Sequence, residues 1–241
     1  MNKIQKNLKK DGFVLIKGFL SKDKDFLNFK KYLNFFFLNV FSIKKNNSVN
    51  LDELIITHFN KGDNISAYLN DNINLSPNLQ KILTSNKILH LLGKLNKVKK
   101  DDLIFNNQRF RIQIPNNDKI ANLPWHQDSH YNTIKRAKSI VVWISISDIT
   151  KEMGPIIFKE HSHKLGELKR KVEKKPNGGK VYSVNINNSK LKKLKSKSME
   201  TKSGDIILID MNSVHASGIN NTINKVKYSA QARYHIVKKF R

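Results

Sequence analysis

The sequence predicts a mainly β protein with helices, in which a helical N-terminal part packs on a β-sandwich or barrel. Residues 1–100 contain helical patterns and one short strand, whereas residues 101–241 contain a series of short strand patterns separated by turns. Helices followed by a run of strands are typical of an antiparallel sheet with helices on one side. A chain of 241 residues can bury one sizeable core, so we expect a single domain over residues 1–241.

The N-terminal part begins with a helical pattern in the first ten residues, followed by the apolar run GFVLIKGFL at residues 12–20, which indicates a short strand. Ser21 can then cap a helix, because its hydroxyl can accept a hydrogen bond from a backbone N–H group of the first turn. The apolar residues of this helix recur at three- and four-residue steps, the helical period. They are Phe26, Phe29, Leu33, Phe36 and Phe37.

A polar break at residues 44–50 is followed by further helical patterns. The pair Ser76-Pro77 predicts the start of a helix, since proline is favoured at the first helical position. Ser85 predicts the cap of the next helix, which runs through NKILHLLGKL and is expected to end near Gly93.

After Lys100 the pattern changes to that of strands. Residues 103–115 alternate apolar and polar side chains, and residues 139–149 form a longer predicted strand. One face of the longer strand carries Ile140, Val142, Ile144 and Ile146, and the other carries Val141, Trp143, Ser145 and Ser147. Further strands are predicted at residues 154–158, 180–186, 204–210 and 225–237. The charged segments 164–180 and 190–198 are expected to be exposed loops.

The composition excludes several kinds of site. The chain has no cysteine, so disulfides, thiolate metal sites and cysteine nucleophiles are ruled out. The basic N-terminus does not have a signal-peptide pattern, because Lys17 interrupts its apolar run and no small-residue cleavage site follows. The most apolar stretch, residues 32–41, is too short to span a membrane. We therefore expect a cytoplasmic protein without a membrane span.

The net charge of +26 has two explanations. Strongly basic surfaces are typical of proteins that bind nucleic acid or membranes. Arginine, however, is scarce, and the lysines are spread along the chain instead of forming one stripe. Lys, Asn and Ile are all abundant together, which indicates a compositional bias, so no nucleic-acid partner is expected. A basic surface would still help attract a small anionic substrate.

The candidate chemistry lies in LPWHQDSHY at residues 123–131. His126 and Asp128 are two residues apart, so on an extended chain their side chains reach the same side. An imidazole and a carboxylate are two of the three ligands of the two-His-one-carboxylate site that binds non-haem Fe(II) and leaves one face open. The third ligand would be another histidine, and none is singled out by its position alone. The others are His58, His90, His130, His161, His163, His215 and His235.

Several motifs, in order along the chain, resemble those of the phytanoyl-CoA dioxygenase family of Fe(II)/2-oxoglutarate-dependent oxygenases. They are KKDGFVLIKGFLSKDK, LPWHQDSHY, the strand SIVVWISISDI, the turn and Ser-His pair in GPIIFKEHSHKLG, and SGDIILIDMNSVHASGINNT before the last strand. The resemblance covers nearly the whole chain. It implies a double-stranded β-helix, the jelly-roll or cupin-like core, at residues 101–241, with the N-terminal helices packed on it.

The resemblance also implies a catalytic metal site. The iron ligands would be His126, Asp128 and His215, with 2-oxoglutarate as co-substrate and O2 as oxidant. Family members bind the distal carboxylate of 2-oxoglutarate through a basic residue, usually arginine, at a position where this chain has Val226. The nearest basic replacement is Lys227, and Arg233 is the rival.

Further co-substrate contacts are expected from the last strand and its neighbours. Lys227, Ser229, Gln231 and Arg233 share strand parity, so all four can face the barrel interior. Ser217, Trp143 and Gln127 are also expected to contact 2-oxoglutarate. Trp143 could instead be a core residue, and Ser217 could cap a turn. His130 and Tyr131 are the candidates for substrate contact, Arg109 and Arg111 either face the pocket or are solvated, and His163 is expected to be structural.

The resulting prediction is a 2-oxoglutarate-dependent non-haem iron dioxygenase that hydroxylates an unactivated C–H bond of a small, possibly anionic, organic molecule. Halogenating relatives replace the ligand carboxylate with a small residue, whereas this chain keeps Asp128, which favours hydroxylation. The alternative is a metal-binding jelly-roll protein without 2-oxoglutarate oxygenase activity, as the missing arginine suggests. No feature of the sequence predicts an oligomeric state.

Overall fold

The structure is a computed structural model that describes residues 2–43, 50–62, 65–115, 122–131, 134, 138–174 and 179–237. Helices come first along the chain and strands follow, as the sequence predicts, apart from one early strand. Most of the predicted polar break at residues 44–50 lies outside the described residues.

A five-stranded antiparallel sheet forms the larger layer, with the strand order β1–β8–β3–β10–β2. Its strands are β1 (Phe13–Ile16), β2 (Leu103–Gln113), β3 (Ser139–Ser145), β8 (Ile206–Asp210) and β10 (Lys227–Ile236). On the central strand β3, Ile140, Val142 and Ile144 pack in one core cluster together with Ile146, which follows the strand, while Val141 and Trp143 pack in another. The two faces predicted for this strand are therefore confirmed.

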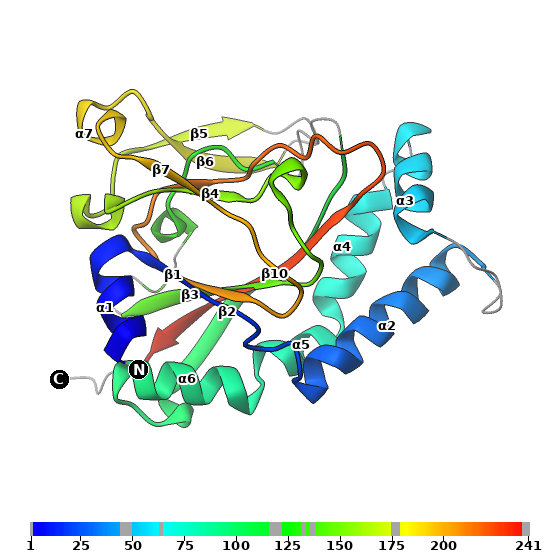
Figure 1. Cartoon of the computed structure of the whole chain (residues 1–241), viewed down its shortest axis with the longest axis horizontal. Coiled ribbons are helices and arrows are strands. Elements are labelled where there is room, and N and C mark those ends of the chain that lie inside the picture. Colours follow the sequence, from blue (N-terminus) through cyan, green and yellow to red (C-terminus); the bar gives the residue numbers. More distant parts are fainter. Residues whose placement is uncertain are drawn as a thin grey trace.

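A second layer lies across from this sheet (Figure 1). It contains a three-stranded sheet of β7 (Ser196–Met199), β4 (Ile156–Lys159) and β9 (His215–Ala216). It also contains a two-stranded ribbon of β5 (Arg170–Lys174) and β6 (Lys180–Val184), called the ribbon below. The space between the two layers holds the candidate site described in the next subsection.

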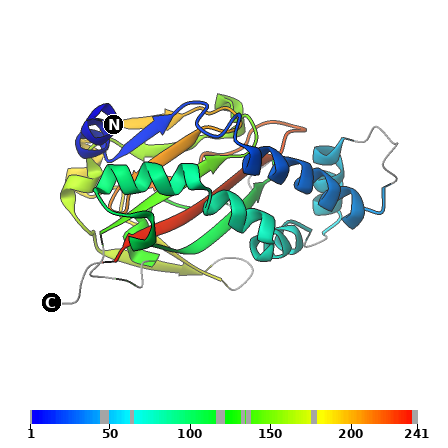
Figure 2. The same ribbon diagram turned by 90° about the horizontal axis from the view of Figure 1, so that it is seen from below.

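The N-terminal helices cover the outer face of the five-stranded sheet (Figure 2). They are α1 (Asn2–Asp11), α2 (Lys24–Val40), α3 (Leu51–Asn60), α4 (Ile65–Leu75), α5 (Pro77–Leu83) and α6 (Asn86–Asn96), and the short α7 (Ser189–Lys192) comes later in the chain. The largest core cluster joins Phe26, Phe29 and Phe37 of α2 to Phe110 of β2 and Tyr234 of β10. A core shared between helices and sheet supports the single domain, which stays a prediction. No helix in the described part of the chain is long and apolar enough to cross a membrane.

Short 3-10 turns complete the secondary structure. They are η1 (Lys100–Asp102), η2 (Asp128–Tyr131), η3 (Lys151–Met153) and η4 (Ser162–Leu165). The turn η2 matters most for the site, because it begins at Asp128. It bends the chain at His126-Gln127-Asp128, called the HxD motif below.

The helix start predicted at Ser76-Pro77 and the cap predicted at Ser85 are both correct. The hydroxyls of Ser76 and Ser85 accept hydrogen bonds from backbone N–H groups of α5 and α6. The prediction for Ser21 is wrong, because its hydroxyl donates back to Gly18 O at 2.9 Å, and Asp23 accepts the hydrogen bond of the first turn of α2 instead.

The helix α6 also runs beyond the predicted end near Gly93. It continues to Asn96 and stops where Lys97 adopts a left-handed conformation, with φ of 57°. The buried Leu95 explains the extension, because the apolar stripe of the helix continues for one further turn.

The described residues of the two charged segments contain regular structure, whereas residues 175–178 lie outside the described residues. Residues 164–180 contain β5, whose five residues are all exposed, and residues 190–198 contain parts of α7 and β7. A strand without a buried face shows no alternation of apolar and polar residues, so its sequence does not reveal it. The prediction of loops was wrong for these residues.

Packing of α2 on the sheet gives a direct test of the core. Phe29 is fully buried, with its ring centroid 5.9 Å from that of Phe110, whereas Phe35 on the same helix is 63% exposed. We expect Phe29→Ala to lower the free energy of unfolding by about 3–5 kcal/mol through lost burial and a cavity. The matched Phe35→Ala should change it by less than about 0.5 kcal/mol. Urea denaturation followed by circular dichroism measures both, and equal effects would contradict this packing.

Candidate active site

The HxD loop and strand β9 are joined backbone to backbone. His126 N donates to His215 O at 2.9 Å, and His215 N donates to His126 O at 3.0 Å, which makes an isolated antiparallel bridge. Ser129 N donates to Met211 O at 2.9 Å and holds the start of η2 to the loop before β9. These bonds bring Asp128 and both histidines to one place, although they lie far apart along the chain.

Hydrogen bonds define the roles of the imidazole nitrogens. His126 Nδ1 lies 2.7 Å from Pro124 O, and His215 Nδ1 lies 2.9 Å from Ser213 O. A carbonyl oxygen only accepts, so each Nδ1 carries the hydrogen and each Nε2 keeps its lone pair. Metal-ligating histidines are typically oriented by such a bond from the second nitrogen. One potential ligand atom from each of His126, Asp128 and His215 lies within 4.8 Å of the others.

The triad is buried, and burial together with neighbouring charges sets the protonation states of its side chains. The side chain of His126 is nearly inaccessible, and burial, with repulsion from His215, lowers the pKa of His126 to about 3. Burial alone would raise the pKa of Asp128, but Arg233 and the two imidazoles favour the charged form, so its pKa falls below the usual range. A neutral imidazole and an ionised carboxylate are the forms that bind a metal.

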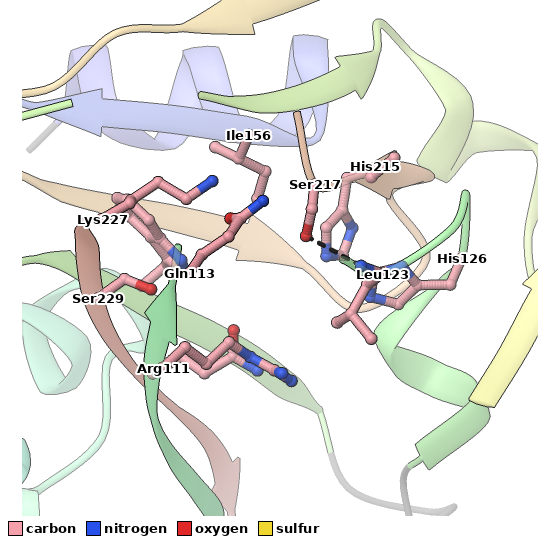
Figure 3. Close-up of a pocket in the computed structure, with 12 residues that line it drawn as sticks. Arg111, Gln113, Leu123, His126, Ile156, His215, Ser217, Lys227 and Ser229 are labelled. Atoms are coloured by element: carbon pink, nitrogen blue, oxygen red, sulfur yellow. Dashed lines mark hydrogen bonds between the residues drawn. The ribbon is translucent and has the colours of Figure 1, made fainter. Parts of the chain in front are cut away.

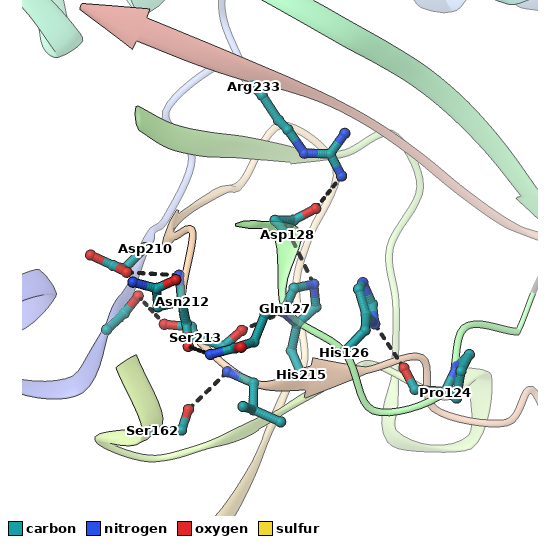
Figure 4. A network of polar contacts seen from close by, with 12 residues as sticks. Pro124, His126, Gln127, Asp128, Ser162, Asp210, Asn212, Ser213, His215 and Arg233 are labelled. Atoms are coloured by element: carbon teal, nitrogen blue, oxygen red, sulfur yellow. Dashed lines mark hydrogen bonds and ion pairs between the residues drawn. The ribbon is translucent and has the colours of Figure 1, made fainter. Parts of the chain in front are cut away.

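Arg233 on β10 forms a buried ion pair with Asp128 Oδ1 (Figure 4). The other carboxylate oxygen, Oδ2, is buried, lies 3.5 Å from His215 Nε2 and accepts no hydrogen bond from the described residues. A buried carboxylate oxygen without a donor is costly unless a cation binds it. The residues therefore fit a divalent metal ion held by His126, Asp128 and His215.

The remaining histidines lie elsewhere, and this triad is the only metal-competent group in the described part of the chain. His161 Nδ1 and His163 Nε2 contact the backbone carbonyls of Lys10 and Lys9, at the end of α1. This agrees with the structural role expected for His163.

An inner cavity adjoins the triad (Figure 3). In the figure, Lys227, Gln113 and Ser229 lie across from His126 and His215. Ser217, Trp143 and Arg111 also line it. Of the six residues predicted to bind 2-oxoglutarate, the structure therefore brings four to this cavity: Lys227, Ser217, Trp143 and Ser229. Trp143 also packs in a core cluster, so both roles considered for it apply.

Lys227 is a buried cation with no carboxylate partner among the described residues. Its side chain is 7% exposed, and its Nζ donates to Gly154 O at 2.5 Å. Burial, with repulsion from Arg111, lowers the pKa of Lys227 to about 7. Arg111 borders the same cavity, and burial, with repulsion from Arg109 and Arg233, lowers its pKa to about 10. Two desolvated cations beside one cavity favour an anionic ligand.

The other two predicted co-substrate residues lie outside the inner cavity. Arg233 pairs with Asp128 and lines a different cavity. Gln127 is fully buried beside the triad: its Nε2 donates to Gly166 O and Asn212 O, and its Oε1 accepts from Leu168 N. Both ends of the Gln127 side chain therefore hold loops together.

A second cavity, called the outer cavity below, also borders His126. It is larger than the inner cavity, at about 820 Å³ against about 520 Å³ with open mouths included. Its polar lining includes Asn107, Arg109, Arg111, Tyr131, Lys180 and Arg233. Sequence reasoning left Arg109 and Arg111 open and missed Lys180, which lies on the ribbon. The alternation of Arg109, Arg111 and Gln113 along one strand was the available signal.

The ribbon closes one side of this outer cavity. Tyr182 N donates to the Tyr131 hydroxyl at 2.9 Å, and the guanidinium of Arg170 donates to His130 O at 2.9 Å. The same guanidinium lies 4.4 Å from the ring centre of Tyr182. His130 itself contacts Leu168 O through Nε2 and does not line the cavity, whereas Tyr131 does.

Comparison with known proteins identifies the family. Residues 8–225 match the family model described as phytanoyl-CoA dioxygenase (PhyH). The chain belongs to the phytanoyl-CoA dioxygenase family. The match includes the whole His-Asp-His triad and ends just before Lys227. Family and triad together make iron the metal and 2-oxoglutarate the co-substrate, with O2 as the oxidant typical of the family.

Solved structures share the fold at low sequence identity. The epimerase SnoN, in complex with Fe3+, alpha ketoglutarate and nogalamycin RO, is 16% identical, with a TM-score of 0.68 over 98% of this chain and 83% of SnoN. EvdO2 from Micromonospora carbonacea var. aurantiaca, complexed with 2-oxoglutarate, is 12% identical, with a TM-score of 0.62 over 98% and 91%.

EctD from S. alaskensis with bound Fe is 14% identical, with a TM-score of 0.64 over 98% of this chain and 76% of EctD. These likenesses confirm the jelly-roll fold with N-terminal helices. No curated protein matches the chain.

Alanine substitution of single histidines tests which of them bind the metal. We expect His215→Ala to lose stoichiometric Fe(II) binding, because two remaining ligands do not hold the ion firmly. His90→Ala, at an exposed position of α6, should bind Fe(II) as the wild type does. Anaerobic titration calorimetry measures both variants. Full Fe(II) binding by His215→Ala would contradict the assignment of this ligand.

Proposed function

We propose that the protein is an Fe(II)- and 2-oxoglutarate-dependent dioxygenase that hydroxylates an unactivated C–H bond of a small organic substrate. The observation that carries the proposal is a buried triad with both Nε2 lone pairs available, next to a cavity lined by Lys227, a buried cation that pairs with no described carboxylate. The triad provides the metal site, and the cation provides a partner for a carboxylate.

In this proposal His126, Asp128 and His215 hold the metal and are the catalytic residues. Lys227 binds the distal carboxylate of 2-oxoglutarate as a point charge, and Ser229 donates a hydroxyl hydrogen bond to it. Arg111 adds a second positive charge at the inner cavity. Trp143 and Ser217 shape the walls around the co-substrate.

The metal and its co-substrate would supply the oxidation. With O2 they convert the substrate C–H and 2-oxoglutarate into C–OH, succinate and CO2. The protein's own contribution is to exclude water and to fix the ligands. Arg233 positions the Asp128 carboxylate through their ion pair, so that the second oxygen, Oδ2, remains available for the metal.

Retention of Asp128 supports hydroxylation over halogenation, since halogenating relatives lack this carboxylate. The names of similar structures nevertheless include an epimerase and a carbocyclase, SnoN and SnoK. The same fold therefore carries several reactions, and hydroxylation rests on the ligand set and not on these likenesses.

One observation favours a second candidate, a metal-binding jelly-roll protein that does not use 2-oxoglutarate. Val226 stands where relatives usually have the arginine that binds the co-substrate, and this side chain is buried in the main core. The two functions differ in whether Lys227 binds a carboxylate, which can be measured without knowing the substrate.

Absorption spectroscopy of the complex between Fe(II) and 2-oxoglutarate tests whether the protein binds this co-substrate. Anaerobic Fe(II) protein titrated with 2-oxoglutarate should develop the weak visible charge-transfer band of a 2-oxo acid bound to Fe(II). Lys227→Ala should need at least about tenfold more 2-oxoglutarate to reach the same band, because it loses a charged hydrogen bond. Lys227→Arg should retain binding. Fe(II) binding without any band in the wild type would favour the second candidate.

The pKa of Lys227 predicts how binding depends on pH. With a pKa of about 7, Lys227 is charged below this pH and loses its proton above it. A bound carboxylate stabilises the charged form, so 2-oxoglutarate affinity should be steady at lower pH. Above about pH 7 it should fall by up to about tenfold per pH unit.

Calorimetry of the anaerobic Fe(II) protein across this range measures that slope. In Lys227→Arg the slope should disappear, because arginine stays protonated. An affinity that is independent of pH in the wild type would rule out Lys227 as the titrating anchor.

A further inference from the structure

The lining of the outer cavity is strongly and one-sidedly charged. Among the described residues, it is lined by four cationic side chains, Arg109, Arg111, Lys180 and Arg233, and by no carboxylate. Arg233 is already paired with the adjacent Asp128, so the other three cations carry the excess charge. Like charges that face a common space repel one another unless an anion occupies it.

Arginine usage makes this clustering unusual for the chain. The sequence has only six arginines among its 45 basic residues, and three of the four that the structure describes line this one cavity. The compositional bias that explains the surface lysines does not explain these arginines. Arginine differs from lysine in presenting a rigid fork of donors that matches a carboxylate or phosphoryl group.

The strand register sets the positions of the two free arginines. Arg111 pairs with Ser229 and Arg109 pairs with Gln231 across the β2–β10 ladder, so both lie on the face that lines the barrel interior. Lys180 approaches from a different element, at the start of β6 in the ribbon. Cations from two elements can therefore surround one bound group.

The hydrogen bonds of these side chains leave donors free for a ligand. Arg111 Nε is buried and donates to no described residue, and Arg109 donates to the neighbouring Gln108 O at 3.1 Å. Repulsion from Arg109 and Arg233 contributes to the lowered pKa of Arg111, which fits a cluster without its anion. A buried unpaired donor is normally satisfied when the site is filled.

We propose that the outer cavity binds an oxyanion group of the substrate, a carboxylate or a phosphoryl group, through Arg109, Arg111 and Lys180. This inference rests on the proposed function, in which the inner cavity holds 2-oxoglutarate. His126 borders both cavities, so an oxyanion held at Arg109 leaves the rest of the substrate next to the metal. Leu123, Tyr131 and Val181 offer apolar contact for that part. The substrate class is therefore a small organic acid or phosphorylated compound.

The test uses methylphosphonate and propionate as probes, each titrated into the anaerobic Fe(II)/2-oxoglutarate protein and, separately, into metal-free protein. We expect at least one probe to bind the wild type, and Arg109→Gln to weaken that binding at least about tenfold through the loss of a charged, forked contact. Lys171→Gln is the matched control: it removes one positive charge from the exposed strand β5, and Lys171 does not line the cavity. It should bind the probe as the wild type does.

Three results would overturn the proposal. The first is that neither probe binds the wild type in either form, and the second is that Lys171→Gln weakens binding as much as Arg109→Gln. The third is that a probe added to protein that already shows the 2-oxoglutarate band abolishes the band by occupying the inner cavity. The band itself reports on the proposed function. A normal band without probe binding refutes only the oxyanion site, whereas probe binding without a band refutes only the use of 2-oxoglutarate.

Discussion

The paired backbone hydrogen bonds between His126 and His215 are the constraint on which the site depends. They join a loop to a short strand from a distant part of the chain, so the two imidazoles face each other before any metal arrives. Their ring centres lie 4.3 Å apart. Backbone bonds do not depend on side-chain identity, so this placement survives substitution around it. The hydrogen bonds that the two Nδ1 atoms donate to Pro124 O and Ser213 O then leave each Nε2 free to face a metal.

The site also contains several buried charged side chains. Asp128 forms an ion pair with Arg233, whereas Lys227 and Arg111 form none with a described carboxylate. Such unpaired cations lower stability, because desolvation opposes their charge and no described carboxylate forms an ion pair with them. The large core shared by helices and sheet provides the stability that tolerates them. Buried cations of this kind mark a site that is completed by anionic ligands.

Much of this could be predicted from the sequence, and the failures have physical causes. The faces of β3 were predictable because a buried strand keeps its alternation, and the caps at Ser76 and Ser85 because the hydroxyl has a local partner. Ser21 failed because a nearby carboxylate, that of Asp23, takes the cap.

The residues of the site likewise include some that the sequence predicted and some that it did not. The ordered motifs pointed to His126, Asp128 and His215, and strand parity pointed to Lys227 and Ser229. Parity did not reveal that Arg233 would turn to Asp128, because that depends on a loop from elsewhere in the chain. Lys180 begins the strand that the sequence predicts at residues 180–186, but its exposed position at the strand end gives no sign in the sequence that it borders the cavity.

The ribbon has a consequence for how this protein can evolve. It supplies Lys180 and Val181 to the outer cavity, but β5 is exposed along its whole length, and the large core lies elsewhere. Exposed substitutions there should disturb folding little. The walls that meet the substrate can therefore change while the metal-binding scaffold stays intact, so new substrate preferences can arise by drift on one surface hairpin.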